Sequence, residues 1–357
     1  MAYTNIDDPS AFFHTLLWTG NGANNRALTN DANAGNFKPD WVWIKPRSAA
    51  EWHNVYDSSR GVNKGLYTNS TYQEESLSQT FESFDTNGFT VSYNSAYSSV
   101  FTNKNSTTYV AWQWKTNGGT TASNTDGTIT STVQANTDAG FSIQTFTSAS
   151  SGNSNWGHGL GVTPDVFIVK RRDGTSSWWG HWKGTARTAG SGNNWQYMPL
   201  NSTAAATSLS TFKADSTTIT TSNDFVPNSA SMLCYAFAEK KGYSKFGKYV
   251  GNGSTDGPFV YTGFKPAFVM IKRTDSTGGW TIYDNKRGYN GNNYELFPHS
   301  SEAEYTGTSF FEADILSNGF KLRLTDGQIN ASGGSYIYMA FAENPFTTST
   351  GIPTTAR

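Results

Sequence analysis

The sequence predicts an all-β protein built from three homologous β-sandwich or jelly-roll-like modules in tandem. Two phrases recur three times, and no segment shows a sustained helical period of apolar residues. The opening phrase is an apolar run beside a proline, at Phe37–Lys45, Val162–Lys170 and Phe264–Lys272. The closing phrase sets an alanine among large rings, at Tyr109–Lys115, Leu233–Glu239 and Ile337–Glu343. Gly, Asn, Ser and Thr dominate the gaps, which is typical of loops between short strands.

The spacing of the two phrases sets the size of a module. The proline and the alanine are 72, 72 and 74 residues apart, as Pro39 and Ala111, Pro164 and Ala236, and Pro266 and Ala340. A constant separation over that length indicates repeated units, each large enough to hold a core. We expect an N-terminal segment at 1–7, modules at 8–120, 121–242 and 243–346, and a loose tail at 347–357. The repeat leaves open whether the copies surround a pseudo-threefold axis as one body.

Each opening phrase is expected to be a strand buried on both faces. Proline suits the start of a strand, and the run that follows is rich in Val, Ile, Trp and Phe. The lysine at the end of each run is expected to mark where the strand leaves the core, at Lys45, Lys170 and Lys272. The closing phrase is expected to be a central strand whose alanine lets a facing sheet come close.

Two Asn-Gly pairs predict tight hairpins. Asn87-Gly88 and Asn318-Gly319 each lie between apolar residues, which is the strongest short-range hairpin signal. In the second copy we assign the equivalent region to Ser222–Val226, which has no glycine. Its turn is therefore expected to differ from the other two.

Composition excludes several classes of function. The net charge is −1 and only 15% of the residues are charged, so we expect no binding of nucleic acid. Aromatic residues make up another 15%, which argues against disorder. We expect neither a signal peptide nor membrane insertion, because the first residues lack a basic and apolar leader pattern and no apolar run is long enough to span a bilayer. The lone cysteine, Cys234, lies in an apolar phrase and is expected to be buried.

The sequence offers no pattern typical of catalysis. The five histidines lack metal-ligand spacing, so neither a metal nor a cofactor is expected. Asp57 and Asp284 stand at matching places, three residues before Arg60 and Arg287. Because matching carboxylates would lie in different modules, too far apart for a glycosidase, we interpret them as structural ion pairs. The chain is therefore expected not to be an enzyme.

A group of tryptophans in the second copy is the best candidate for a binding site. The rings stand among Gly, Ser and Asn, and they are Trp178, Trp179, Trp182 and Trp195. Rings among neutral hydrogen-bonding groups are what sugar binding requires, so we predict glycan binding there. The alternative is that these rings cap the core of the module or lie at a subunit contact.

Further phrases resemble a family of tailed-bacteriophage proteins that is common in marine and cyanobacterial phage genomes. They are Trp18–Gly22, Phe37–Lys45, Asp126–Val133, Ala139–Ile143, Gly157–Asp165, Glu239–Gly247 and Gly251–Val260. The resemblance runs from about Leu16 to Phe346, nearly the whole chain. It implies a tail fibre or other virion structural protein, and it carries no catalytic residues.

The resemblance implies a protein that is made in the host cytoplasm and incorporated into the virion, in the tail rather than on the capsid surface. Its expected partners are other virion proteins, further copies of itself in a homo-oligomer, and a glycan of the host surface. We expect a tail fibre or receptor-binding component. A capsid decoration protein without a ligand is the alternative, and a polysaccharide depolymerase is a weaker one.

Overall fold

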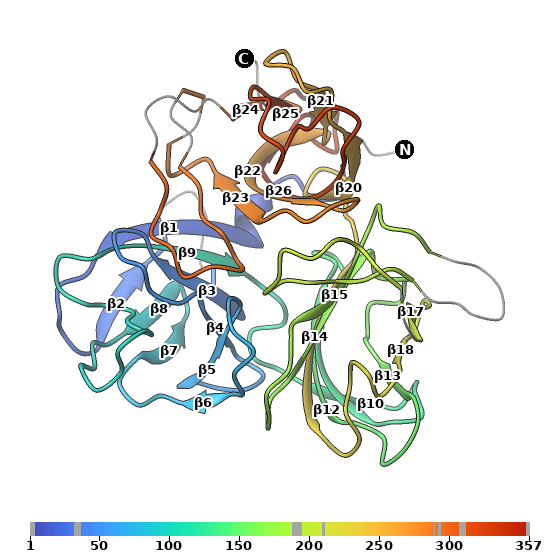
Figure 1. Ribbon diagram of the computed structural model, residues 1–357. Helices are drawn as coiled ribbons and strands as arrows, with labels where there is room; N and C mark the ends of the chain where they lie inside the picture. Colours follow the sequence, from blue (N-terminus) through green and yellow to red (C-terminus); the bar gives the residue numbers. More distant parts are fainter. Residues whose placement is uncertain are drawn as a thin grey trace.

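The computed structural model describes residues 4–31, 37–187, 195–208, 211–288, 290–291, 294–306 and 312–354. Within these ranges the chain is all-β, as predicted, and every pairing between its strands is antiparallel. The described helical structure is a single 3₁₀ turn at Pro9–Ala11. Two sheets recur in each third of the chain, and Figure 1 shows the three resulting lobes.

Module 1 consists of a large and a small sheet. The large sheet has the order β1-β9-β3-β4-β5-β6, and the small sheet has the order β2-β8-β7. The strands are β1 Phe13–Thr19, β2 Arg26–Thr29, β3 Trp41–Pro46, β4 Asn54–Asp57, β5 Lys64–Tyr67, β6 Glu75–Ser76, β7 Phe81–Asp85, β8 Gly88–Val91 and β9 Thr108–Trp114.

Module 2 repeats this plan with two strands added in front. Its large sheet has the order β10-β11-β12-β19-β14-β15-β16, and its small sheet has the order β13-β18-β17. The strands are β10 Ala122–Asn124, β11 Ser131–Asn136, β12 Phe141–Thr147, β13 Ser154–Gly157, β14 Val166–Arg171, β15 Trp179–Trp182, β16 Met198–Pro199, β17 Phe212–Ala214, β18 Thr218–Thr221 and β19 Ser231–Phe237.

Module 3 is the smallest version of the plan. Its large sheet has the order β20-β26-β22-β23, and its small sheet has the order β21-β25-β24. The strands are β20 Ser244–Val250, β21 Phe259–Tyr261, β22 Phe264–Arg273, β23 Trp280–Asp284, β24 Ala313–Leu316, β25 Gly319–Leu322 and β26 Ser335–Pro345.

The repeated phrases become the two central strands of each large sheet. The opening phrase forms β3, β14 and β22, and the closing phrase forms β9, β19 and β26. Strand β3 is buried along its whole length, as predicted for a strand covered on both faces. The pairing register defines equivalent positions, because Trp41, Val166 and Phe268 occupy the same place opposite Asp57, Trp182 and Asp284.

Each closing strand contributes side chains to two different cores. In β9, Tyr109 and Ala111 lie in the core between the two sheets of module 1. Alternate residues, including Trp112 and Trp114, point to the opposite face and enter a cluster shared by all three modules. The alanines of the closing phrases, Ala111, Ala236 and Ala340, all lie in the core of their own module.

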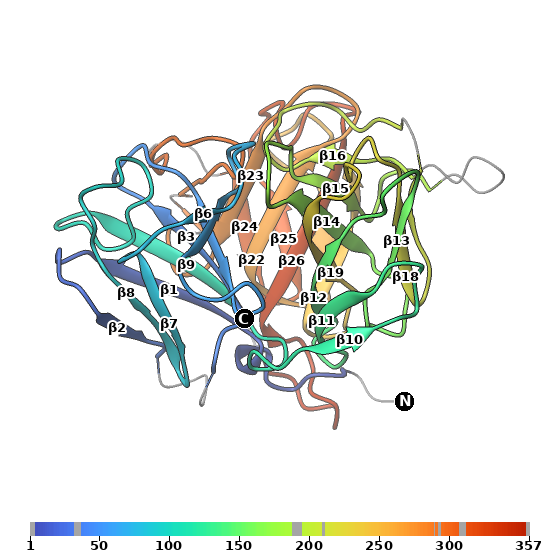
Figure 2. The same ribbon diagram turned by 90° about the horizontal axis from the view of Figure 1, so that it is seen from below.

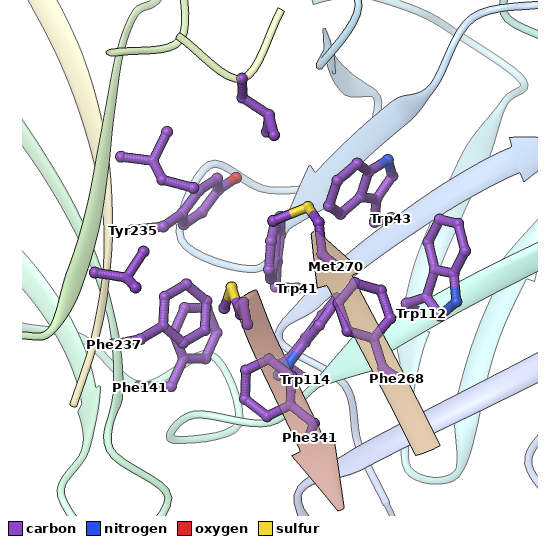
Figure 3. Close-up of a cluster of buried hydrophobic side chains, with 14 of the residues drawn as sticks. Trp41, Trp43, Trp112, Trp114, Phe141, Tyr235, Phe237, Phe268, Met270 and Phe341 are labelled. Carbon is purple, nitrogen blue, oxygen red and sulfur yellow. The ribbon is translucent and has the colours of Figure 1, made fainter. Parts of the chain in front are cut away.

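The shared central core joins the three modules into one body. In Figure 1 the large sheets face the centre and the small sheets lie outside, and Figure 2 shows the opening and closing strands gathered at the middle. The ring of Trp41 lies 4.7 Å from that of Tyr235, and Trp114 lies 5.4 Å from Phe341 (Figure 3). Since fully burying one large apolar side chain contributes about 1.5–3 kcal/mol, this cluster contributes strongly to holding the modules together.

Both Asn-Gly pairs form the predicted hairpins, between β7 and β8 and between β24 and β25. The second copy differs, as expected, but not where we placed the difference. Its hairpin joins β17 to β18 through Asp215, whose carboxylate accepts from the backbone N–H groups of Thr217 and Thr218. Ser222–Val226 follows β18 instead, because the loops of this copy differ in length.

The two ends of the described chain meet near the junction of modules 2 and 3. Thr4 bonds to the backbone of Lys241, and Asp7 accepts two bonds from Ser349. The part of the tail that the structure describes therefore contacts the N-terminal segment, although we expected the tail to be loose.

Candidate functional site

Two of the four predicted glycan-binding rings are buried between modules. Trp178 and Trp182 are each 1% exposed and belong to the central core. The indole of Trp178 donates to the carbonyl oxygen of Tyr67 in module 1 at 2.7 Å, and Trp182 packs 4.5 Å from Trp280 of module 3. A ring in that position cannot stack on a sugar, so these two residues hold interfaces instead.

The other two rings are half-buried and face the inside of module 2. Trp179 packs edge-on against Tyr197 and Phe225. The guanidinium of Arg187 lies 4.2 Å from the ring centre of Trp195. The four predicted rings thus form no common platform on the surface, because Trp178, just before β15, and Trp179, its first residue, point to opposite faces.

The predicted ion pair of Asp57 and Arg60 is present and is part of a network across the interface of modules 1 and 2 (interface 1/2). The two residues are 2.5 Å apart, and Arg60 also lies 3.0 Å from Glu74. From module 2, Arg172 reaches Glu74 at 3.0 Å and the Tyr235 hydroxyl donates to Asp57 at 2.6 Å. Burial opposes the charge of Arg60, but the neighbouring carboxylates outweigh it and hold the Arg60 pKa above its usual value.

The same network recurs between modules 3 and 1 (interface 3/1). Arg287 lies 2.6 Å from Asp284 and 2.9 Å from Glu304, and both side chains of the Asp284–Arg287 pair are fully buried. From module 1, Arg47 reaches Glu304 at 2.7 Å and the Trp112 indole donates to Asp284 at 2.9 Å. The two interfaces therefore use equivalent residues in equivalent roles.

The interface between modules 2 and 3 (interface 2/3) keeps the backbone contacts and loses the charges. The Ala206 N–H donates to the Thr274 carbonyl at 2.8 Å, as the Glu74 N–H does to Arg172 and the Glu304 N–H to Arg47. The five network positions here hold neutral side chains, namely Trp182, Thr185, Ala206, Thr274 and Met339. All five change together, because a single remaining charge would be buried without a partner.

The three lysines expected at the edge of the core are fully buried, so that expectation is wrong. Each ammonium group donates to carbonyl oxygens, and one acceptor of each lies in a neighbouring module. The pairs are Lys45 with Ser301, Lys170 with Thr71 and Lys272 with Thr203, at 3.2, 3.0 and 3.3 Å. Burial lowers the pKa of Lys45 and Lys170 to about 7 and that of Lys272 to about 8.

A pair of carboxylates that the sequence did not reveal lies inside module 3. The Tyr283 hydroxyl bonds to both Glu295 and Glu312, which are 5% and 7% exposed. Burial and the neighbouring Glu312 raise the pKa of Glu295 to about 10. The pair is enclosed within the module, unlike the acids of an open active site. Among the described residues, no group of His, Cys, Asp and Glu could hold a metal ion.

A cleft of about 680 Å³ at the edge of module 3 is a candidate site, and we call it the Tyr261 cleft. Tyr261 and Phe346 form its aromatic part and are 58% and 36% exposed. Its remaining lining is Thr4, Glu239, Lys241, Gly242, Ser244, Lys245, Thr262, Gly263 and Thr347. Positive φ angles at Gly242 and Gly263 let the backbone form this concave surface without side chains in the way.

The aromatic side chains of strand β21 are specific to module 3. Phe259 and Tyr261 point outward on either side of buried Val260. The equivalent strands are β2, where Ala27 and Thr29 flank Leu28, and β13, where Asn155 and Gly157 flank Trp156. The fold therefore does not require aromatic residues at these two positions. A comparison of the three copies around β21 is the sequence signal that could have found this site.

A second cleft, of about 210 Å³, lies at interface 3/1. It contains His14 and Asp31, whose side chains approach to 3.4 Å, and Lys286 lies 3.1 Å from the other oxygen of Asp31. At the equivalent place on interface 2/3, Asp165 and Glu239 both bind Lys183. The smaller cleft is therefore a polar contact between modules that is less completely filled.

The fold defines an all-β protein of three joined modules, and the third module carries the Tyr261 cleft. A comparison with protein families adds that the chain belongs to the family described as Domain of unknown function (DUF7483), whose model matches residues 8–345. That single match spans all three modules, so the whole body is the unit of the family. No curated protein and no solved structure matches the chain. No described helix is long and apolar enough to cross a membrane.

Proposed function

We propose that this chain is a non-enzymatic structural protein of a bacteriophage virion and that it contacts the surface of the host cell. The resemblance of its repeated phrases to tailed-phage proteins supports the assignment to a virion. The outward Phe259 and Tyr261 carry the proposal of a surface contact, because the equivalent positions of the other modules fold with small or polar residues. Exposed apolar side chains that a fold does not require mark interaction sites.

The joined architecture suits this role. A shared central core and three buried lysine contacts fix the modules relative to one another, so a contact surface on module 3 is held rigidly. The buried, hydrogen-bonded state of Asp57, Asp284, Glu295 and Glu312 supports a role without hydrolysis, because a glycosidase needs its two carboxylates at the substrate. Assembly into a homo-oligomer within the tail is part of the proposal.

Quantitative mass spectrometry of purified particles tests the virion assignment. We expect a few to a few dozen copies per particle, which corresponds to a tail protein. Hundreds of copies would indicate capsid decoration, and the absence of the chain would refute a virion role.

An adsorption assay tests the surface contact. Purified protein should compete with intact phage for host cells, and a Tyr261→Thr variant should compete less well. Release of oligosaccharides from host polysaccharide by the purified chain would instead identify a depolymerase.

A further inference from the structure

We infer that the open edge of β1 binds an extended segment of a partner protein, which adds to the large sheet of module 1 as a further antiparallel strand. The open edge is the side of Phe13–Thr19 that faces away from β9. The smaller cleft at interface 3/1 receives one end of the segment. This site is separate from the Tyr261 cleft, so the inference goes beyond the proposed contact with the host.

Module 2 shows that the fold accepts a strand at this place. Strands β1 and β12 are equivalent, because each pairs in the same register with the closing strand of its module, and Thr15 corresponds to Ile143. On its other edge β12 pairs with β11 (Figure 2), where Gln134 lies opposite Ile143. Strand β1 ends the order of its sheet, so within the described ranges no strand pairs with its open edge.

The backbone groups of β1 that would bind a strand follow from its pairing with β9. The carbonyl oxygen of Phe12 accepts from the N–H of Lys115 at 3.0 Å. In an antiparallel pair the hydrogen bonds to one neighbour fall on alternate residues. The N–H and C=O groups of Thr15 and Leu17 therefore point away from β9 and toward the open edge.

The equivalent edge in module 3 is protected, whereas that of β1 is not. Strand β20 also ends the order of its sheet, but it carries Lys245 and Lys248. Gly184 of module 2 lies against it, since a side chain added at this glycine would be 3.1 Å from the carbonyl oxygen of Gly247. Charged residues and a covering segment are typical protections of an edge strand. The sequence of β1 is FHTLLWT, which contains no lysine, arginine, acid or proline.

Two buried polar atoms in the smaller cleft are available to the incoming segment. The cleft continues interface 3/1, and its lining includes Thr15 of module 1 and Asn285 of module 3. Thr15 is 4% exposed, and neither its Oγ1 nor the Oδ1 of Asn285 has a hydrogen-bond partner among the described residues. Because buried oxygens are normally paired in folded proteins, a donor from another molecule would be favourable there.

The equivalent place at interface 1/2 contains a carboxamide. Ser58 corresponds to Asn285, since their N–H groups donate to the equivalent carbonyl oxygens of Asp40 and Ala267. Gln134 of β11 donates to the Ser58 hydroxyl oxygen at 2.9 Å. A glutamine at the same place in a partner segment would donate to Asn285 Oδ1 in the same way. We therefore expect a segment that is extended and carries a glutamine or asparagine.

The depth of the cleft favours a single extended segment over a folded second copy. Phe13, His14 and Thr15 are at most 6% exposed, so this end of β1 lies at the bottom of the cleft between two modules. A strand inside a folded sheet brings its neighbouring strands with it and cannot enter there, whereas a separate segment can. The rest of the segment would cover Leu16 and Leu17, which are half-buried.

A peptide with the sequence of β11 is a defined probe for this site. The capped peptide Thr130–Asp138 should bind the purified full chain in titration calorimetry. Methylation of the backbone nitrogen of Gln134 should weaken binding about tenfold or more, because by the same alternation this N–H faces the accepting strand. Methylation at Val133, whose N–H faces β10 in the protein, is the control and should leave binding unchanged.

Variants of the protein test the role of the carboxamide. Asn285→Ala should weaken binding of the peptide about fivefold, and so should Gln134→Leu in the peptide, because each removes the same hydrogen bond. The two changes together should weaken binding no further. Ser58→Ala is the matched control, since its place at interface 1/2 is already filled by β11. Melting temperatures of both protein variants verify that the fold is intact.

Three results would overturn the inference. Strand addition is refuted if the unmodified peptide does not bind or if the two methylated peptides bind equally well. The role of the smaller cleft is refuted if Asn285→Ala binds the peptide as tightly as the wild type. If the purified chain forms oligomers that the peptide dissociates, the occupant is a second copy, and the assignment to a partner protein is wrong.

Discussion

Interfaces 1/2 and 2/3 join their modules at equivalent positions, but interface 1/2 uses charged side chains there and interface 2/3 uses neutral ones. Both keep a buried lysine that donates to the neighbouring module and a backbone hydrogen bond at the position of Glu74 or Ala206. Around this shared frame, interface 1/2 buries a network of two arginines, two carboxylates and a tyrosine hydroxyl. Interface 2/3 fills the same space with Trp182 and neutral neighbours.

The difference teaches that the charged network is not needed to join two modules, since interface 2/3 keeps the buried lysine and the backbone hydrogen bond without it. In a buried ion network, the attraction between the charges offsets their desolvation free energy only when every member is present. Replacing all members together with neutral side chains can therefore leave stability unchanged. Removing a single member leaves a buried charge without a partner, which is strongly destabilising. Among the described residues, each interface has either the whole charged network or neutral side chains at all five network positions. No interface combines the two.

The largest effect is expected from breaking one network. Asp57→Ala leaves the fully buried Arg60 guanidinium without its nearest carboxylate, which should cost about 3–5 kcal/mol of unfolding free energy. Urea denaturation followed by tryptophan fluorescence measures this loss. Thr185→Ala, at the position equivalent to Arg60, is the control and should cost about 1 kcal/mol. Equal losses in the two variants would show that the network does not distinguish the interfaces.

The buried lysines should matter equally at both kinds of interface. Lys170→Met and Lys272→Met each leave carbonyl acceptors of two modules without their donor, at a cost of about 1–3 kcal/mol. Denaturant midpoints of the two variants should agree. A much larger loss for Lys170→Met would mean that the charged network, and not the shared frame, determines the role of the lysine.

A full exchange sharpens the comparison. Replacing all five positions of interface 1/2 with the residues of interface 2/3 should cost at most about 2 kcal/mol, which is less than Asp57→Ala alone. The substitutions are Asp57→Trp, Arg60→Thr, Glu74→Ala, Arg172→Thr and Tyr235→Met. Calorimetric melting of the fivefold and the single variant gives the order directly. A greater loss in the fivefold variant would contradict the view that the members act as a unit.

Interface 3/1 should be the most sensitive to acid. It contains His53 and His299, whereas Asn69 and Asn201 replace His299 at the other two interfaces. Burial, with help from Lys272, lowers the pKa of His299 to about 4, and burial also lowers the pKa of His53 well below its usual value. The folded state thus binds fewer protons than the unfolded state. The stability that the neutral histidines contribute is fully present above pH 6.5, and it is lost as the pH falls from 6.5 toward 4.

The variant His299→Asn, which uses the residue of the other copies, should remove part of this loss. Between pH 7 and pH 5 the wild type should lose about 1–2 kcal/mol more than the variant. Denaturant unfolding at both pH values measures the difference. Identical pH dependence in the two proteins would assign the acid sensitivity to other groups.

Several features of the fold were predictable from local patterns. The repeated phrases identified β3 and β9 and their counterparts. A short apolar run after a proline can bury both of its faces as a strand inside a sheet, which is where the opening phrase lies. The Asp57–Arg60 and Asp284–Arg287 pairs followed from their recurrence at a fixed spacing. The burial of Cys234 followed from its place in a central strand.

The position of the candidate site was not predictable from the sequence. The sequence indicated exposed rings among neutral polar groups, but it assigned this role to the tryptophans of module 2 and missed Tyr261. Alternation along a strand shows that two faces exist, and it does not show which face meets another module. Trp178 and Trp182 happen to point to the centre, so their rings join the shared core.

The sequence by itself determined the all-β class, the repeat and the central strands, because these depend on neighbours within one module. Only the tertiary structure decided the burial of Lys45 and its two counterparts, the partners of the ion pairs and the exposure of Tyr261. The partners of Asp57 and Asp284 lie 178 and 172 residues away along the chain, in Tyr235 and Trp112. Contacts of that range arise from the packing of whole modules, which leaves no periodic signal in the sequence around either residue.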